Sequence, residues 1–153
     1  MFDLGLPIAL TFRGVDILAP LCLPLLGRLP FSWLYPTGEK QDTIEPKWQK
    51  WYKWADVIVG DFLIIRRHLP EALPGKLIVT NSTTAEDIEL LRQCGVSAVV
   101  TTSLRVEDRS FGTNVLEGIL TVLAGRPLKD MEREEIVELG RSVGWRPEII
   151  KLN

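Results

Sequence analysis

Three short apolar runs decide the fold of this chain: Asp56-Val-Ile-Val-Gly60, Lys76-Leu-Ile-Val-Thr80 and Val96-Ser-Ala-Val-Val-Thr101. Runs of this length that are apolar throughout are typical of strands buried on both faces, as in a parallel sheet. Helices are expected between and after them, at residues 62–69, 84–94, 115–124 and about 130–143. Because strands and helices alternate, the pattern predicts an α/β fold. We expect a Rossmann-like three-layer domain with a short, mainly parallel sheet.

The first third of the chain is less regular. Leu4 to Leu34 is rich in Leu, Ile and Pro. Its longest uncharged stretch, Ile17 to Gly27, contains two prolines and is shorter than the ~18–20 residues that cross a bilayer. We therefore expect an irregular apolar N-terminal arm and loop over residues 1–46, followed by the Rossmann-like domain over 47–153. The arm favours contact with a partner, either a second copy in a homodimer or a missing N-terminal half, over a membrane.

Composition and spacing exclude several classes of function. The net charge of −2 gives no electrostatic drive towards nucleic acid. Tryptophan and lysine each recur every three residues in 47–54, which is typical of an amphipathic helix whose tryptophans pack on the core.

Two cysteines cannot form a disulfide framework, and they indicate a reducing, cytoplasmic compartment. His68 has no second ligand at metal spacing, so we expect it to face solvent at a helix end and predict no metal site.

Small polar residues follow all three predicted strands. Ligands of open parallel sheets bind beyond the carboxyl ends of the strands, where the first turns of the following helices offer free N–H groups. The sequence therefore predicts a cup for a small anionic or polyol ligand. The candidate ligand-binding residues are Gly60, Asn81, Ser82, Thr83, Thr84, Thr101, Thr102, Arg109, Ser110, Gly112, Thr113 and Asn114. Helix capping alone is the alternative for each of them, and Asn114 with Glu117 resembles a capping box.

Two residues are candidate acid or base groups. Asp61 is the carboxylate directly at a strand end, and capping the following helix is its alternative role. Lys40, in the loop Thr37-Gly-Glu-Lys40, is the lysine that we expect to be most mobile. No glycine-rich dinucleotide loop, phosphate-binding loop or nucleophile elbow is present, so no motif identifies a cofactor.

Four stretches resemble a bacterial family labelled quinate 5-dehydrogenase: Arg28–Gln41, Trp54–Phe62, Thr80–Asp87 and Arg109–Glu117. Members of that family are longer, and this chain corresponds to their C-terminal half. The resemblance implies NAD- or NADP-dependent oxidation of a ring hydroxyl on a quinate- or shikimate-like acid, with Asp61 and Lys40 as acid/base candidates. The chain lacks the glycine-rich loop and the catalytic-lysine string of shikimate dehydrogenases. Their absence favours the alternative, a non-catalytic α/β sensor module that binds a ligand or anion.

Overall fold

The computed structural model describes residues 11–30, 38 and 43–153 of the chain. Its elements are α1 (Phe12–Leu26), α3 (Gln49–Trp54), β1 (Val57–Val59), α4 (Phe62–Arg67), β2 (Leu77–Thr80), α5 (Ala85–Gln93), β3 (Ala98–Thr101), β4 (Arg105–Val106), β5 (Arg109–Ser110), α6 (Thr113–Ala124), the 3-10 helix η2 (Leu128–Asp130), α7 (Arg133–Ser142) and β6 (Glu148–Lys151). The main sheet has the order β1-β2-β3-β6. Strands β1 to β3 are parallel and β6 is antiparallel to β3. The mixed α/β class with a small, mainly parallel sheet is therefore confirmed.

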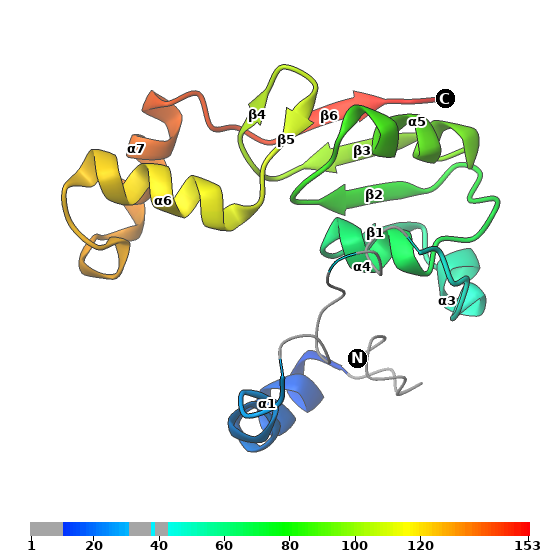
Figure 1. Cartoon of the computed structure of the whole chain (residues 1–153), viewed down its shortest axis with the longest axis horizontal. Helices are drawn as coiled ribbons and strands as arrows, with labels where there is room; N and C mark the ends of the chain where they lie inside the picture. Colours follow the sequence, from blue (N-terminus) through cyan, green and yellow to red (C-terminus); the bar gives the residue numbers. More distant parts are fainter. Residues whose placement is uncertain (1–10, 31–37, 39–42) are drawn as a thin grey trace.

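The hydrophobic core lies between one face of this sheet and helices α4 and α5 (Figure 1). Ile78 and Val99 on the inner face have no exposed surface, and neither has Leu91 on α5. Phe62 at the start of α4 belongs to the same cluster. Because the parallel strands are adjacent in chain order, right-handed crossovers place both helices on the same face. The described residues thus build two layers, a sheet and a helical layer.

The N-terminal arm is not irregular throughout, because residues 12–26 form α1. The hydroxyl of Thr11 caps this helix by accepting a hydrogen bond from the backbone N–H of Gly14, at 3.2 Å. Pro20 and Pro24 lie inside the helix, and each removes one backbone donor without ending it. Among the described residues, no helix has the length and apolar character needed to span a membrane.

The expectations for Trp54 and for His68 are wrong, whereas Trp48 and Trp51 are half-buried. Trp54 is 76% exposed, whereas Tyr52 on the other side of α3 is buried and donates its hydroxyl proton to the carbonyl of Ile65, at 3.1 Å. Tyrosine can join the core here because its polar tip finds an acceptor in the last turn of α4, the Ile65 carbonyl that also accepts the backbone N–H of His68. His68 does end α4, but it is buried rather than solvent-facing, with Nδ1 3.0 Å from the carbonyl oxygen of Glu45.

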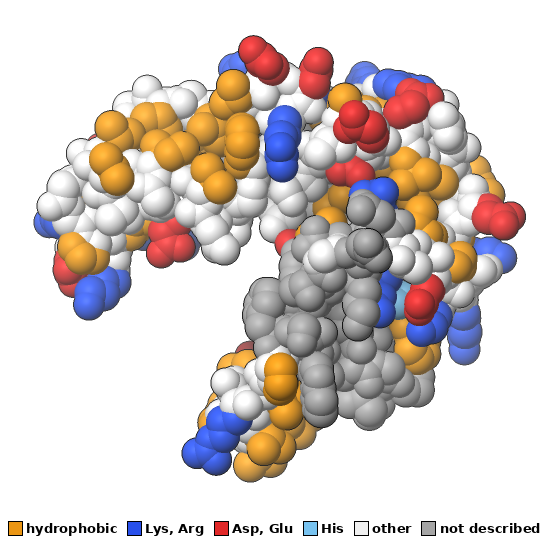
Figure 2. Space-filling model, in the orientation of Figure 1, with side chains coloured by type: hydrophobic (Ala, Val, Ile, Leu, Met, Phe, Trp, Pro, Cys, Tyr) orange, Lys and Arg blue, Asp and Glu red, His pale blue; other side chains and the backbone are white. Residues whose placement is uncertain are grey.

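Helices α6 and α7 form a lobe beyond the carboxyl ends of the parallel strands (Figure 1). The hairpin β4–β5 and the segment that leads into β6 connect this lobe to the sheet. Figure 2 shows apolar side chains gathered on the outer surface of α6 and on α1. The strand β6 was not predicted, and its antiparallel return brings residues 144–148 back to the carboxyl edge of the sheet.

Candidate functional site

Asp61 and Asn81 meet at the carboxyl edge of the sheet, as the predicted cup requires. The side-chain amide of Asn81 donates a hydrogen bond to Oδ2 of Asp61, at 3.0 Å. Oδ1 of Asp61 accepts one from the backbone N–H of Leu63, also at 3.0 Å, so this carboxylate caps α4. Both carboxylate oxygens thus hold structural hydrogen bonds, while the acid/base role of Asp61 stays a prediction. Lys40 lies outside the described residues.

Thr83 and Ser110 bring two further predicted segments together. The hydroxyl of Ser110 accepts a hydrogen bond from the backbone N–H of Thr83 at 2.7 Å and lies 2.9 Å from its hydroxyl. The backbone N–H of Ser110 donates in return to the carbonyl of Thr83, at 3.0 Å. Both side chains are buried. Their polar groups therefore fasten the loop after β2 to β5 and are directed at each other.

The remaining residues at this edge are mainly engaged in helix caps and turns. Thr84 caps α5 in a capping box with Asp87. Asn81 Oδ1 accepts from the backbone N–H of Ser82 at 2.8 Å, and Thr102 donates its hydroxyl proton to the carbonyl of Thr80 at 3.2 Å. Gly60, exposed at the end of β1, donates its backbone N–H to the carbonyl of Val79, at 3.1 Å. Capping, the alternative role, is thus observed for Thr84.

At the start of α6 the predicted capping box is wrong. The helix begins at Thr113 with Gly112 as its N-cap, and no side chain caps it. Asn114 is therefore inside the first turn, where it is exposed, as is Thr113. Glycine is accepted at the N-cap position at a cost of only about a few tenths of a kcal/mol relative to a capping side chain.

Arg109 is exposed and its guanidinium lies over the ring of Phe111, 5.7 Å from the centroid. Its charge also acts on Glu86 at the start of α5. Hydrogen bonds from the Glu86 backbone and from Thr84 lower the pKa of that carboxyl most, and the Arg109 charge adds to the effect. Arg109 thus has an aromatic face and a nearby carboxylate rather than an open anion position.

Thr101 at the end of β3 and the nearby Ser103 carry the two buried hydroxyls that have no hydrogen-bond partner within the described part of the chain. Both residues have no exposed surface. A buried hydroxyl without a partner costs about 1–3 kcal/mol relative to a paired one. The unpaired hydroxyl of Thr101, at the carboxyl end of β3, therefore lowers the free energy of unfolding.

We expect Thr101→Val to raise the free energy of unfolding by about 1 kcal/mol, because valine keeps the shape and removes the unpaired hydroxyl. Thr80→Val is the matched control on the neighbouring strand, where the hydroxyl lies 3.4 Å from Oδ1 of Asn81. That variant is expected to lose stability instead. Urea unfolding measures both, and a loss of stability in Thr101→Val would show that its hydroxyl is paired in solution.

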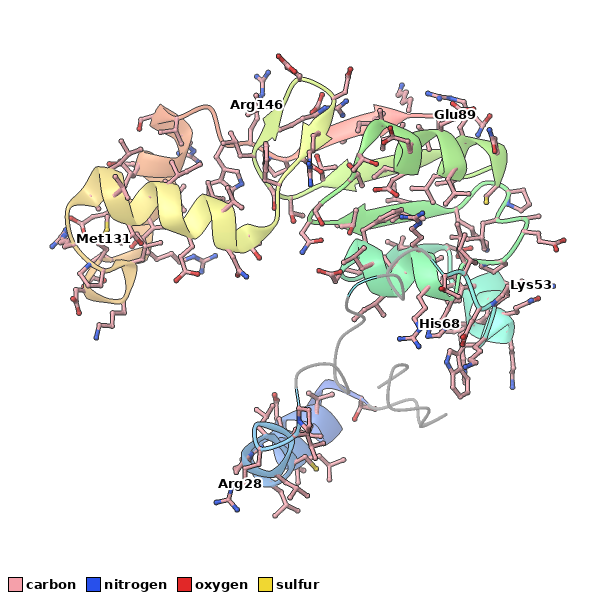
Figure 3. The ribbon with its side chains drawn as sticks, in the orientation of Figure 1. Arg28, Lys53, His68, Glu89, Met131 and Arg146 are labelled. Carbon is pink, nitrogen blue, oxygen red and sulfur yellow. The ribbon has the colours of Figure 1, made fainter. Side chains whose placement is uncertain are left out.

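A second arrangement at this edge was not foreseen from the sequence. A cavity of about 270 Å³ lies between the β4–β5 hairpin and the segment before β6. Its lining residues are Arg105, Glu107, Gly144, Arg146 and Glu148. Glu148 pairs with Thr101 in the sheet register, so the cavity adjoins the carboxyl end of β3. Figure 3 shows Arg146 beside the hairpin.

The two arginines of the cavity differ in their surroundings. Arg105 donates from Nε to the carbonyl of Glu107 at 3.0 Å, and it forms ion pairs with Glu148 at 3.6 Å and Asp108 at 3.7 Å. Arg146, in contrast, has no ion pair or hydrogen bond with any residue that the structure describes. One guanidinium is thus held in place, and the other is available to a ligand.

Trp145 fixes the backbone on which Arg146 is carried. Its indole N–H donates to the carbonyl of Thr102 at 2.9 Å, and its backbone N–H donates to the carbonyl of Gly140, also at 2.9 Å. The ring packs against Gly140, where a side chain would collide with it. The end of α7 and the end of β3 are therefore tied together next to the cavity.

Comparisons with known proteins place the chain in a family without assigning an activity. A family model described as a domain of unknown function (DUF8754) matches residues 1–152. The chain belongs to this family. No curated protein and no solved structure matches it. The function therefore has to be argued from the geometry of the candidate site.

Proposed function

We propose that this chain binds a small hydroxylated carboxylic acid in the cavity lined by Arg105 and Arg146. The observation that carries this proposal is the unpaired guanidinium of Arg146 in a cavity that also holds two carboxylates. A guanidinium presents two parallel N–H donors to a carboxylate. Glu107 and Glu148 offer acceptors for ligand hydroxyl groups, since ionised carboxylates only accept hydrogen bonds.

The composition of the cavity also favours this class over a polyanion. The lining contains two arginines and two glutamates, so its formal charges cancel and leave no strong positive field. A phosphate with two negative charges would meet both glutamates at close range. A ligand with one carboxylate and several hydroxyls matches the donors and acceptors better, and a volume of about 270 Å³, below the ~300–1,000 Å³ typical of ligand pockets, restricts the site to a small molecule.

The resemblance to quinate 5-dehydrogenases supports the same ligand class, because quinate and shikimate are cyclic hydroxy acids. An NAD- or NADP-dependent oxidoreductase with a Rossmann-like domain is the second candidate function. The parallel strands β1 to β3, with Asp61 and Asn81 together at their carboxyl edge, favour it. If the chain only binds the hydroxy acid, it is a sensor module; if it is an oxidoreductase, it oxidises the same hydroxy acid. A cytoplasmic location fits both, since Cys22 and Cys94 are free thiols.

Calorimetric titration of the chain with quinate, shikimate and inorganic phosphate tests the proposal. We expect saturable binding of a hydroxy acid that is weakened at least about tenfold in Arg146→Gln, because charge-assisted hydrogen bonds are lost. Arg133→Gln on α7 is the matched control. It removes the same charge from another exposed arginine without an ion pair among the described residues, and it should bind as the unchanged chain does.

The same titration separates the two candidate functions. Saturable binding of NADP+ or NAD+ would favour the oxidoreductase. Hydroxy-acid binding without dinucleotide binding would favour the sensor module. Equal affinity of Arg146→Gln and the unchanged chain for the hydroxy acid would contradict the assigned cavity.

A further inference from the structure

One face of the main sheet is apolar and uncovered by the described residues. Adjacent residues of a strand point to opposite faces, so the inner row with Ile78 leaves an outer row on the other side. The register aligns that row across the sheet, with Val59 beside Val79, Val100 and Ile149. Val57 is 48% exposed, Val59 72% and Ile149 66%. We call this surface the open face. Mainly parallel sheets are normally covered on both faces, and residues 11–30 and 43–153 supply a covering layer on one face of this sheet.

Helix α1 is an apolar helix whose exposed side chains are likewise left uncovered by the rest of the described chain. Six of its large apolar side chains are exposed: Val15, Ile17, Leu18, Leu21, Leu23 and Leu25. Its last turn has no basic residue, and its charged residues are Arg13 and Asp16 near its start. A helix that lies in a membrane interface has a polar face rich in Lys and Arg. The composition of α1 therefore favours a protein surface as its partner.

We propose that the chain forms a two-fold dimer in which α1 of each copy packs on the open face of the other. Both complementary surfaces belong to the same chain, so a two-fold pair buries each of them twice. A helix of 15 residues is about 22 Å long, and four strands span about 15 Å, so α1 is long enough to cross the sheet. In the single chain α1 lies apart from its own sheet (Figure 1).

The exposed area is sufficient for a stable dimer only when both surfaces take part. At roughly 100 Å² per large apolar side chain, the three on the open face and the five on one side of α1 (all but Leu23) expose on the order of 800 Å² per copy, about the 800 Å² per partner of a standard interface. The open face alone has three exposed large apolar residues, which is too few. Residues 30–44 lie between the turn that ends α1 and Glu45, whose backbone N–H bonds to Arg67, and a chain of that length spans up to about 50 Å when extended.

Sedimentation equilibrium of the full chain tests this proposal. We expect a mass of twice 17.3 kDa at micromolar concentration. Leu21→Asp on α1 and Val59→Asp on the open face should each weaken the dimer at least about a hundredfold, because an aspartate would be buried without a partner. Val122→Asp, at an 80% exposed position of α6 outside both surfaces, is the control and should leave the dimer intact. Circular dichroism checks that all three variants fold.

Mixing Leu21→Asp with Val59→Asp tests whether α1 of one copy packs on the open face of the other copy. Leu21→Asp keeps an intact open face and Val59→Asp keeps an intact α1, so a mixture restores one of the two contacts and part of the dimer. A monomeric unchanged chain would overturn the proposal and favour α1 closing on its own sheet. A dimer that Leu21→Asp leaves intact would also overturn it, because α1 would then lie outside the interface. A monomer that co-sediments with phosphatidylcholine vesicles would overturn it in favour of a membrane surface.

Discussion

Replacing Leu91 by alanine is expected to lower the free energy of unfolding by about 3 kcal/mol. Leu91 lies on the inner side of α5, has no exposed surface and belongs to the cluster that joins the sheet to both helices. Truncation removes buried apolar contacts and leaves a cavity between elements that cannot close around it. Urea unfolding followed by circular dichroism measures the loss.

Leu123→Ala is the matched control, because Leu123 also lies on a helix, α6, but is 54% exposed. The change in helix propensity is the same in both variants. We expect the control to alter the free energy of unfolding by less than about 0.5 kcal/mol. Equal effects at the two positions would contradict the placement of the core between the sheet and α5.

Gly140→Ala is expected to destabilise the chain by about 2 kcal/mol, although alanine is normally the better helix former. The new methyl group would occupy the place of the Trp145 ring. The ring cannot simply move away, since its indole N–H is bonded to the carbonyl of Thr102. Because Trp145 lies between Gly144 and Arg146, we also expect weaker binding of the hydroxy acid.

Gly118→Ala on α6 is the control for this prediction. A side chain added at Gly118 meets nothing within 4 Å, so that substitution should stabilise the chain by up to about 1 kcal/mol. Thermal unfolding of the two variants and titration of each with quinate give both readouts. If Gly140→Ala gained stability as Gly118→Ala does, Trp145 would not pack on α7 as described.

The parallel strands β1, β2 and β3 could be predicted because their sequence runs are apolar at successive positions. Such runs are typical of strands buried on both faces, and this expectation is wrong for β1, an edge strand in which Val57 and Val59 are exposed. The edge strand β6 contains only Ile149 and Ile150 between charged residues, too short a pattern to be recognised. The helix α1 was missed for the opposite reason. Its prolines indicated a break, although a helix can continue past a missing donor.

The candidate site likewise has one part that the sequence could predict and one part that it could not. Polar residues directly after the strands meet because parallel strands end at one edge, and the contacts of Asp61 with Asn81 and of Thr83 with Ser110 follow from that rule. Arg105 and Arg146 are far apart in the sequence, and no motif links them. They line one cavity only because β6 returns antiparallel to β3.

The most direct test of the proposed function is a two-dimensional amide NMR titration of the chain with quinate or shikimate at constant ionic strength. We predict saturable shifts at residues 105–108 and 144–148 and at the side-chain Nε–H of Arg146, which all lie around the cavity. Shifts confined to residues 81–84 and 110–114 would contradict the cavity and move the ligand to the helix starts. The absence of saturable shifts with either acid would contradict the proposed ligand class.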